Sequence, residues 1–209
     1  MKIKQFVFNH FQVNCYLLWD EQTKECTIVD PGAEELSEDQ AMANFITQNG
    51  LTPTRILLTH PHIDHVCGLE QACNRYNLPV TLHPEGMKTL SQAELYGSMM
   101  NFRVNNMKDI PTEFVQHGDK LGEIECRYVP GHCPGSMAFV LPQEKMVITG
   151  DALFRGSIGR TDLPGGDYDL LMKSLRTQLL TLDDTYVILP GHGDTSTIGE
   201  ELMYNGFLQ

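Results

Sequence analysis

The segment Thr59-His-Pro-His-Ile-Asp-His65 constrains the fold more than any other stretch of this chain. Its first residue ends a short apolar run over residues 55–59, and the segment precedes another whose apolar residues recur at helical spacing. A cluster this polar is expected in a loop, where water or a bound ion can satisfy it. The sequence therefore predicts a loop between a buried strand and a helix, with the histidines gathered at the end of the strand.

The spacing within this segment is suited to metal binding. Residues two apart in an extended chain project to the same side, so His60 and His62 can reach one metal ion together. Asp64 and His65 lie where the chain turns into the helix and can direct a carboxylate and an imidazole toward a second ion. Taken alone, Asp64 is better explained as the N-cap of that helix.

Three further polar residues follow strand-like runs and stand beside glycines: His132, Asp151 and His192. We expect each histidine to supply one nitrogen to an ion and Asp151, with two carboxylate oxygens, to bridge the two ions. Taken singly, Asp151 could be a simple turn residue and the two histidines could make local hydrogen bonds. Their shared position at strand ends favours the metal interpretation.

The rest of the chain predicts two sheets with helices packed outside them, in one domain over residues 1–209 without a linker. Helices are expected over residues 34–48, after residue 65 and over 167–182, and the first three strands should pair as a meander. Residues 83–112 lack firm periodicity and are left unassigned. The predicted strands are residues 3–8, 14–19, 25–29, 55–59, 79–82, 123–129, 137–141, 145–148 and 186–189.

Composition and charge limit the classes of molecule to which this protein can bind. The net charge of −12 at pH 7 would repel nucleic acid, and we find no run of roughly 20 apolar residues that could span a bilayer. The N-terminus has no pattern of an export signal. The 6 cysteines include no CxxC pair, which indicates reduced thiols and a cytoplasmic location. We expect a monomer that acts on a small molecule.

The motif set resembles that of the metallo-β-lactamase superfamily. The matching motifs of this chain occur in the order typical of the superfamily: the segment over residues 59–65, then Gly131-His132, Gly150-Asp151 and Gly191-His192. The resemblance implies an α/β fold of the four-layer αβ/βα sandwich type and two divalent metal ions, zinc in the first place, with iron or manganese as alternatives. It also assigns the ligands: the first ion is held by His60, His62 and His132, the second by Asp64, His65 and His192, and Asp151 bridges them.

Within the superfamily the chain is similar to glyoxalase II, the hydroxyacylglutathione hydrolases of methylglyoxal detoxification. The similarity lies in Asn14-Cys-Tyr16, Asp30-Pro-Gly32 and the residues around Asp151. Longer members hold glutathione with a C-terminal helical domain, whereas only residues 193–209 follow His192 here. A lysine of that family is replaced by Arg160, and two expected tyrosines by Asp162 and Asp194.

The resemblance implies hydrolysis of S-lactoylglutathione or a similar thioester. Two metal ions would lower the pKa of water to about 7 and polarise the carbonyl, while Asp64 and Asp151 orient the water. Arg155 and Arg160 are placed to hold a substrate carboxylate, although Arg160 could instead pair with Asp162. We interpret Cys133, next to His132, as a packing residue or a hydrogen-bond donor to a ligand residue rather than a catalytic thiol, so its alanine variant should retain most turnover.

Other functions share these motifs. A persulfide dioxygenase would use a single iron, held by His60, His132 and Asp151. Lactonase and β-lactamase activities are less favoured, because the loop over residues 159–162 matches the thiol-carrier branch better. A metal-binding protein without enzymatic activity is the remaining alternative. His10, His83 and His117 are assigned no part in the site.

Overall fold

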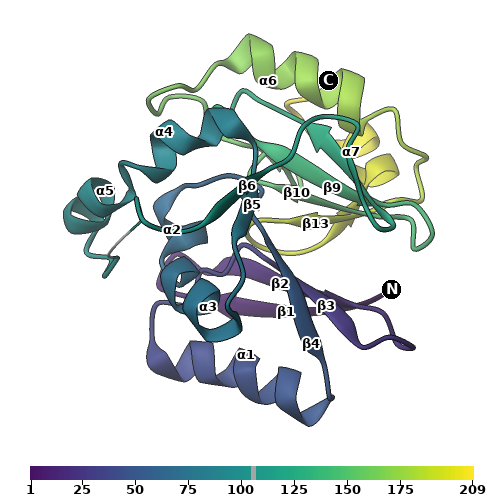
Figure 1. The fold of residues 1–209 in the computed structure, drawn as a ribbon. Helices are drawn as coiled ribbons and strands as arrows, with labels where there is room; N and C mark the ends of the chain where they lie inside the picture. Colours follow the sequence, from purple (N-terminus) through teal and green to yellow (C-terminus); the bar gives the residue numbers. More distant parts are fainter. Residues whose placement is uncertain (105–106) are drawn as a thin grey trace. The chain divides into compact units, whose positions relative to one another are not determined.

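The computed structural model describes residues 1–104 and 107–209 and divides into two compact units (Figure 1). Unit 1 comprises Met1–Leu82 and Met87–Phe114, and unit 2 comprises His83–Gly86 and Val115–Gln209. Each unit has its own six-stranded sheet. The expected single domain over residues 1–209 stays a prediction.

The sheet of unit 1 contains the antiparallel meander that the sequence predicts, followed by parallel strands. β1 pairs with β2 and β2 with β3 in antiparallel fashion, while β3, β4, β5 and β6 are parallel neighbours. The first five strands match predicted runs to within about three residues, whereas β6 was not predicted. Their bounds are β1 Lys2–Phe8, β2 Val13–Trp19, β3 Glu25–Val29, β4 Thr52–Leu57, β5 Val80–Leu82 and β6 Thr112–Phe114.

The helices of unit 1 cover the apolar side chains of this sheet. Met42 and Ile46 of α1 and Leu69 of α3 belong to one buried core with the strand residues Ile28 and Ile56. The segment left unassigned over residues 83–112 contains short helices, and residues 105–106 lie outside the described part of the chain. The helices are α1 Leu36–Gln48, α2 Ile63–Val66, α3 Leu69–Tyr76, α4 Met87–Leu90 and α5 Ala93–Met100.

The sheet of unit 2 has the order β14-β13-β10-β9-β8-β7. β10 and β13 are parallel, and the other neighbouring pairs are antiparallel. A separate two-stranded hairpin is formed by β11 and β12. The bounds are β7 Lys120–Leu121, β8 Ile124–Tyr128, β9 Met137–Leu141, β10 Met146–Gly150, β11 Leu153–Phe154, β12 Ser157–Ile158, β13 Val187–Pro190 and β14 Ser196–Thr197.

Helix α6 of unit 2 spans Tyr168–Ser174 and continues as a π-helix over Leu175–Leu179, close to the predicted helix over residues 167–182. Asp167 caps its start by accepting the Leu170 N–H at 2.9 Å. A short 3₁₀ turn spans Pro84–Gly86. Helix α7, Ile198–Tyr204, was not predicted, because it exposes its own apolar residues Leu202, Met203 and Tyr204.

The parallel strands explain where the polar residues gather. Carboxyl ends of parallel neighbours meet at one edge of a sheet. In unit 1 this edge carries Asp30 after β3 and Thr59 after β4. In unit 2 it carries Asp151 after β10 and His192 after β13.

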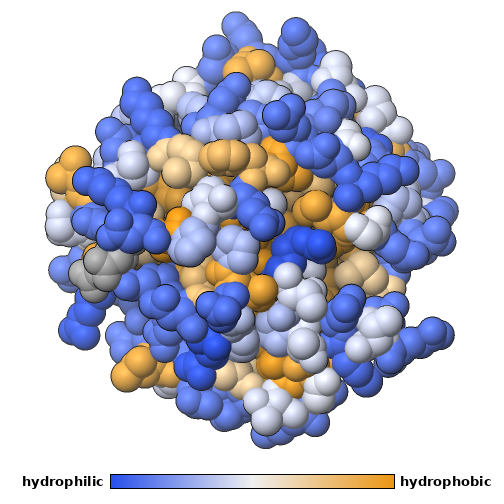
Figure 2. Space-filling view, in the orientation of Figure 1, coloured by the Kyte–Doolittle hydropathy of each residue, from blue (hydrophilic) through white to orange (hydrophobic). Residues whose placement is uncertain are grey.

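Hydrophilic and apolar residues are unevenly distributed on the surface (Figure 2). Figure 2 shows one face, on which hydrophilic residues predominate and apolar residues form smaller groups between them. Among the described residues, we find no helix that combines the length and the apolar character needed to cross a bilayer.

Candidate metal centre

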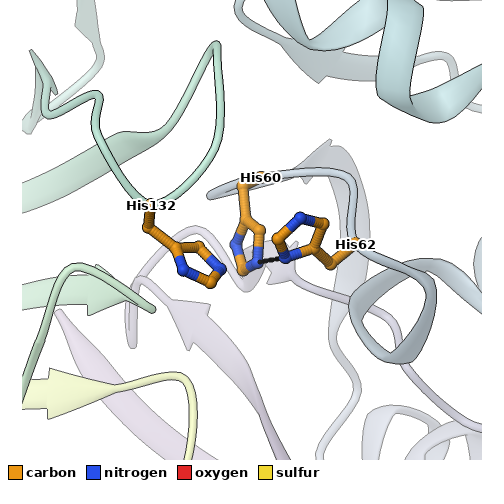
Figure 3. A group of neighbouring side chains, drawn as sticks. All are labelled: His60, His62 and His132. Atoms are coloured by element: carbon orange, nitrogen blue, oxygen red, sulfur yellow. Dashed lines mark hydrogen bonds between the residues drawn. The ribbon is translucent and has the colours of Figure 1, made fainter. Parts of the chain in front are cut away.

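His60 and His62 are the first pair of predicted metal ligands in unit 1. The Nε2 atom of His60 lies 3.1 Å from the Nδ1 atom of His62, as the dashed line in Figure 3 marks. Two nitrogens bound to one tetrahedral zinc ion at normal zinc–nitrogen distances would stand about 3.3 Å apart. The two nitrogens therefore have about the spacing of two ligands to one ion, and binding of a metal by this pair stays a prediction.

Asp64 and His65 form the second pair, in the first turn of α2. The Nε2 atom of His65 lies 3.6 Å from the Oδ2 atom of Asp64, and both side chains are buried. His62 occupies the N-cap position of this helix, and Asp64 comes after it. The interpretation of Asp64 as the N-cap is therefore wrong, because α2 begins one residue before it.

Asp30 is a buried carboxylate that the sequence analysis did not place in the site. It accepts the Thr59 N–H at 2.7 Å, the Thr59 hydroxyl at 2.6 Å and the Nδ1–H of His65 at 2.9 Å. A proton fixed on Nδ1 leaves the Nε2 lone pair of His65 for a metal. The Asp30-Pro-Gly32 motif could have indicated this role, but in the sequence analysis it is only a point of similarity to glyoxalase II.

Asn9 contacts the backbone of the segment over residues 59–65, the ligand segment, near its C-terminal end. Its side-chain Nδ2 donates to the carbonyls of Asp64 at 2.9 Å and Gly32 at 2.8 Å. A Cβ atom on Gly32 would stand 2.3 Å from that Asp64 carbonyl oxygen, so only glycine allows the two segments to approach this closely. These contacts fix the backbone beneath Asp64, and sequence spacing gave no signal for them.

In unit 2, Asp151 stands between His132 and His192. Its Oδ2 atom lies 3.7 Å from the Nε2 atom of His132 and 3.6 Å from the Nε2 atom of His192. The three residues come from the loop between β8 and β9, the end of β10 and the end of β13. One carboxylate beside two imidazole nitrogens is the arrangement expected of a bridging ligand.

The ring of His132, drawn in Figure 3, is oriented by a main-chain group. Its Nδ1 lies 2.7 Å from the carbonyl oxygen of Arg160, an acceptor that places the proton on Nδ1 and leaves Nε2 for a metal. Gly159 makes this approach possible. A Cβ atom there would stand 1.9 Å from the Asp151 carbonyl oxygen and 3.1 Å from the His132 Cβ atom.

The side chain of Arg160 pairs with Asp162. Its Nε and Nη2 atoms donate to the two carboxylate oxygens at 2.8 and 2.7 Å. These hydrogen bonds lower the pKa of Asp162 to about 2. The pairing named as the structural alternative for Arg160 is thus present, while contact of Arg160 with a substrate stays a prediction.

Arg155 lines a groove beside His192. The groove has a volume of about 290 Å³ and is lined by Phe154, Arg155, His192, Gly193 and Asp194. The Nη1 atom of Arg155 lies 3.5 Å from the Oδ2 atom of Asp194, and both side chains are exposed. The second arginine predicted to hold substrate is therefore next to a metal-ligand candidate.

The cysteines are packing residues in this structure. The thiols of six cysteines are buried: Cys15, Cys26, Cys67, Cys73, Cys126 and Cys133. Burial raises the pKa of Cys26 and of Cys73 to about 12. The Cys133 thiol donates weakly to the Pro134 carbonyl at 3.4 Å, a contact that suits the packing role expected of it.

The histidines assigned no part in the site have other partners. His10 stacks on Phe102 with ring centroids 4.4 Å apart and contacts Glu34 at 2.7 Å. His83 stacks on Tyr128 at 4.3 Å, and burial lowers the pKa of His83. The Nδ1 of His117 accepts the Tyr128 N–H at 3.3 Å.

Known proteins are similar to this chain over its whole length. Residues 9–192 match the family model described as the metallo-beta-lactamase superfamily. A probable metallo-hydrolase, YqgX of Bacillus subtilis, is 37% identical, with 100% of this chain and 98% of the relative covered. The hydroxyacylglutathione hydrolase GloC of Haemophilus influenzae is 36% identical, with the same coverage of 100% and 98%.

A solved structure supports the fold assignment. TTHA1623, crystallised in a di-iron-bound form, is 35% identical and superimposes with a TM-score of 0.89, covering 98% of this chain and 100% of that one. The α/β fold of the metallo-β-lactamase type that the motifs imply is thereby confirmed.

Proposed function

The chain belongs to the metallo-β-lactamase superfamily and is accordingly a metal-dependent hydrolase, and on that premise we propose that it hydrolyses hydroxyacylglutathione thioesters such as S-lactoylglutathione. The relative GloC, which carries that name at 36% identity over the full chain, supports this substrate class. The proposal has the chain acting in the cytoplasm as a monomer, on a small-molecule thioester.

The observation that carries the proposal is the position of Asp151 between two imidazole nitrogens, at 3.7 and 3.6 Å. We propose that Asp151 bridges two divalent ions. His60, His62 and His132 hold the first ion, and Asp64, His65 and His192 hold the second. The matching spacings of the ligand pairs in unit 1, 3.1 and 3.6 Å, support this assignment.

The ligand chemistry fits zinc or iron. Imidazole nitrogens and carboxylate oxygens suit both metals, and manganese is favoured by carboxylates more than by imidazoles. We propose zinc as the ion in the cell. The di-iron-bound form of TTHA1623 makes iron the first alternative to test.

When bound, such ions supply water of lowered pKa and polarise a carbonyl oxygen. The chain's own residues do the rest. Asp64 and Asp151 accept hydrogen bonds from the attacking water and orient it. Asp30 keeps the proton of His65 on Nδ1, and the Arg160 carbonyl does the same for His132. Both rings therefore have Nε2 as the nitrogen that can bind a metal.

We propose that Arg155 holds a carboxylate of the substrate, because it lines the groove beside His192. Its partner Asp194 is exposed, and water screens such pairs, so a substrate carboxylate can replace the Asp194 carboxylate at small cost. Arg160 is proposed as a second contact. For that role, the Arg160 guanidinium must break its two hydrogen bonds with Asp162 or bind the substrate through the N–H groups that Asp162 does not use.

The test combines metal analysis with activity on the same purified sample. We expect two metal ions per chain and loss of the S-lactoylglutathione absorbance on addition of protein. The Asp151→Asn variant should lose more than about 100-fold in kcat, because it loses the bridging charge. Glu123→Gln removes one exposed carboxylate of the same unit and is the matched control.

The outcomes separate the alternatives. One iron per chain, with oxygen consumed on glutathione persulfide and no thioester hydrolysis, would favour a mononuclear persulfide dioxygenase. Bound metal without hydrolysis of any thioester, ester or lactam would favour a metal-binding protein that is not an enzyme. Either result would contradict the proposed function.

A further inference from the structure

Two tight loops of unit 2 carry the residues that wall the groove. Arg155 and Gly156 form the two-residue turn between β11 and β12, in which Phe154 pairs with Ser157. His192 and Asp194 lie in the loop between β13 and β14, which ends at Ser196. The distance between Arg155 and His192 therefore depends on how these two loops are held.

Both loops are attached to one buried carboxylate. Glu201 of α7 is 2% exposed. Its Oε2 atom accepts the Gly156 N–H at 2.8 Å and the side-chain N–H of Asn205 at 2.7 Å, and its Oε1 atom accepts the Ser196 hydroxyl. A carboxylate held by three donors on its two oxygens has a fixed orientation.

The bond to Gly156 acts directly on Arg155. The Gly156 N–H belongs to the peptide plane that follows Arg155, so fixing that plane fixes the backbone from which the Arg155 side chain leaves the turn. Asn205 adds a second attachment, because its side-chain nitrogen also donates to the Ser157 carbonyl at 3.0 Å. Ser196 attaches the end of the loop that carries His192.

We propose that Glu201 is a positioning residue. It fixes the position of Arg155 relative to His192 and thereby determines the affinity of the groove for thioesters that carry carboxylates. This inference rests on the proposed function, and it goes beyond it by assigning specificity to a residue of α7. Glu201 does not touch the substrate and acts through Gly156 and Ser196.

A purely structural role would have a different signature. Loss of a fold-stabilising contact lowers the fraction of active protein, which reduces the apparent kcat for every substrate and leaves KM unchanged. Misplacement of Arg155 raises KM for anionic substrates alone. S-lactoylglutathione carries carboxylates, whereas S-lactoyl-N-acetylcysteamine is a neutral thioester with the same acyl group.

The primary variant is Glu201→Gln. A glutamine presents one acceptor oxygen and one donor nitrogen, so the donors on one side lose their acceptor. We expect KM for S-lactoylglutathione to rise about tenfold, with kcat changed less than about twofold and KM for the neutral thioester unchanged. Glu123→Gln, which changes the same charge at an exposed position, should leave all values as they are in the parent protein.

A double-mutant cycle tests the route through Arg155. In the Arg155→Ala background, adding Glu201→Gln should raise KM for S-lactoylglutathione by less than about twofold, because the group that Glu201 positions is already gone. An undiminished tenfold rise in that background would overturn the proposal. So would equal effects on the anionic and the neutral thioester.

Two further measurements keep the test independent of folding and of turnover. If Glu201→Gln does not fold, Ser196→Ala removes one donor and should raise KM for the anionic thioester about threefold. Calorimetric binding of S-methylglutathione, a thioether that cannot be hydrolysed, should weaken in parallel in Glu201→Gln and Arg155→Ala. If the protein binds this probe in that pattern but hydrolyses no thioester, the proposed function fails and the role of Glu201 stands. Probe binding that is unchanged in a folded Glu201→Gln protein would refute the role of Glu201.

Discussion

The Oδ2 atom of Asp30 lies 2.9 Å from the Nδ1 atom of His65, and both side chains are buried. Asp30 follows β3 and His65 follows β4, so the contact depends on the parallel pairing of these two strands. The same carboxylate receives both donors of Thr59. A single residue thus fixes the start of the ligand segment and the tautomer of its last histidine.

Replacing Asp30 by asparagine should weaken the second metal position. The amide oxygen of the new side chain would remain on Thr59 while its NH₂ group faces His65, which favours the tautomer protonated on Nε2. We expect the affinity of the weaker zinc ion to fall by about 10- to 100-fold, measured by competition with a chelating dye. Asp39→Asn, at a buried carboxylate that accepts from Gln71 and Arg75, is the control and should leave zinc affinity unchanged. Equal loss in both variants would show that Asp30 acts only through stability.

Gly159→Ala should disrupt the site by displacing the backbone that carries its residues. The new Cβ atom would stand 1.9 Å from the Asp151 carbonyl oxygen, so the backbone carrying Asp151 or His132 must move. We expect loss of more than about tenfold in kcat/KM together with reduced zinc content, since a shift of about 1 Å can cost 100-fold. Gly206→Ala, where a Cβ atom meets open space, should behave as the parent protein. Full activity of Gly159→Ala would contradict the described approach of these segments.

Arg160→Ala separates the two contacts of this residue. The carbonyl that orients His132 belongs to the main chain and is retained in alanine, whereas the guanidinium is lost. We expect unchanged zinc content and folding, with KM for S-lactoylglutathione raised about three- to tenfold. Steady-state kinetics and elemental analysis of one preparation measure both. Loss of zinc or of folding would instead assign the Arg160 side chain a structural role.

The buried thiols should be unreactive in the native protein. Burial raises the pKa of Cys26 and Cys73 from about 9 to about 12, so their thiolates are scarce at neutral pH. A thiol reagent should react slowly until denaturant is added and should then titrate 6 thiols. Because unfolded thiols lose protons near pH 9 and the folded ones only near 12, these groups should reduce stability as the pH rises above about 9. Rapid labelling of the native protein would contradict the packing role.

Much of the fold follows from local patterns in the sequence. The runs that became β1, β2, β3 and β9 are rich in β-branched and aromatic residues, and turn residues bound them, so their limits are predicted to within one residue. Helix α1 is likewise indicated by its periodicity and by the glycine after its end. These signals are local, and tertiary contacts did not override them.

The elements that were missed lack a local signal. Helix α7 exposes Leu202, Met203 and Tyr204, so its sequence shows no one-sided apolar stripe. Strand β6, Thr112–Phe114, is short and lies at the edge of its sheet, where its parallel partner β5 defines it. Such elements depend on neighbours that are distant in sequence.

The candidate site shows the same division. The ligand residues could be found because histidine and aspartate at strand ends are unusual and occur together. The residues that orient these ligands could not be found in this way. Asp30 and His65 come after two different strands, and Arg160 contacts His132 through a main-chain oxygen that any residue possesses. Likewise, nothing in the sequence links Glu201 to the turn at Gly156.

We propose that two divalent ions are bound by His60, His62, Asp64, His65, His132, Asp151 and His192. The most direct measurement is anomalous diffraction at the zinc absorption edge from crystals grown with zinc. We predict two peaks, one bound by His60, His62 and His132 and the other by Asp64, His65 and His192, with Asp151 bound to both. A map with no peak at these residues, or with peaks that Asp151 does not touch, would contradict it.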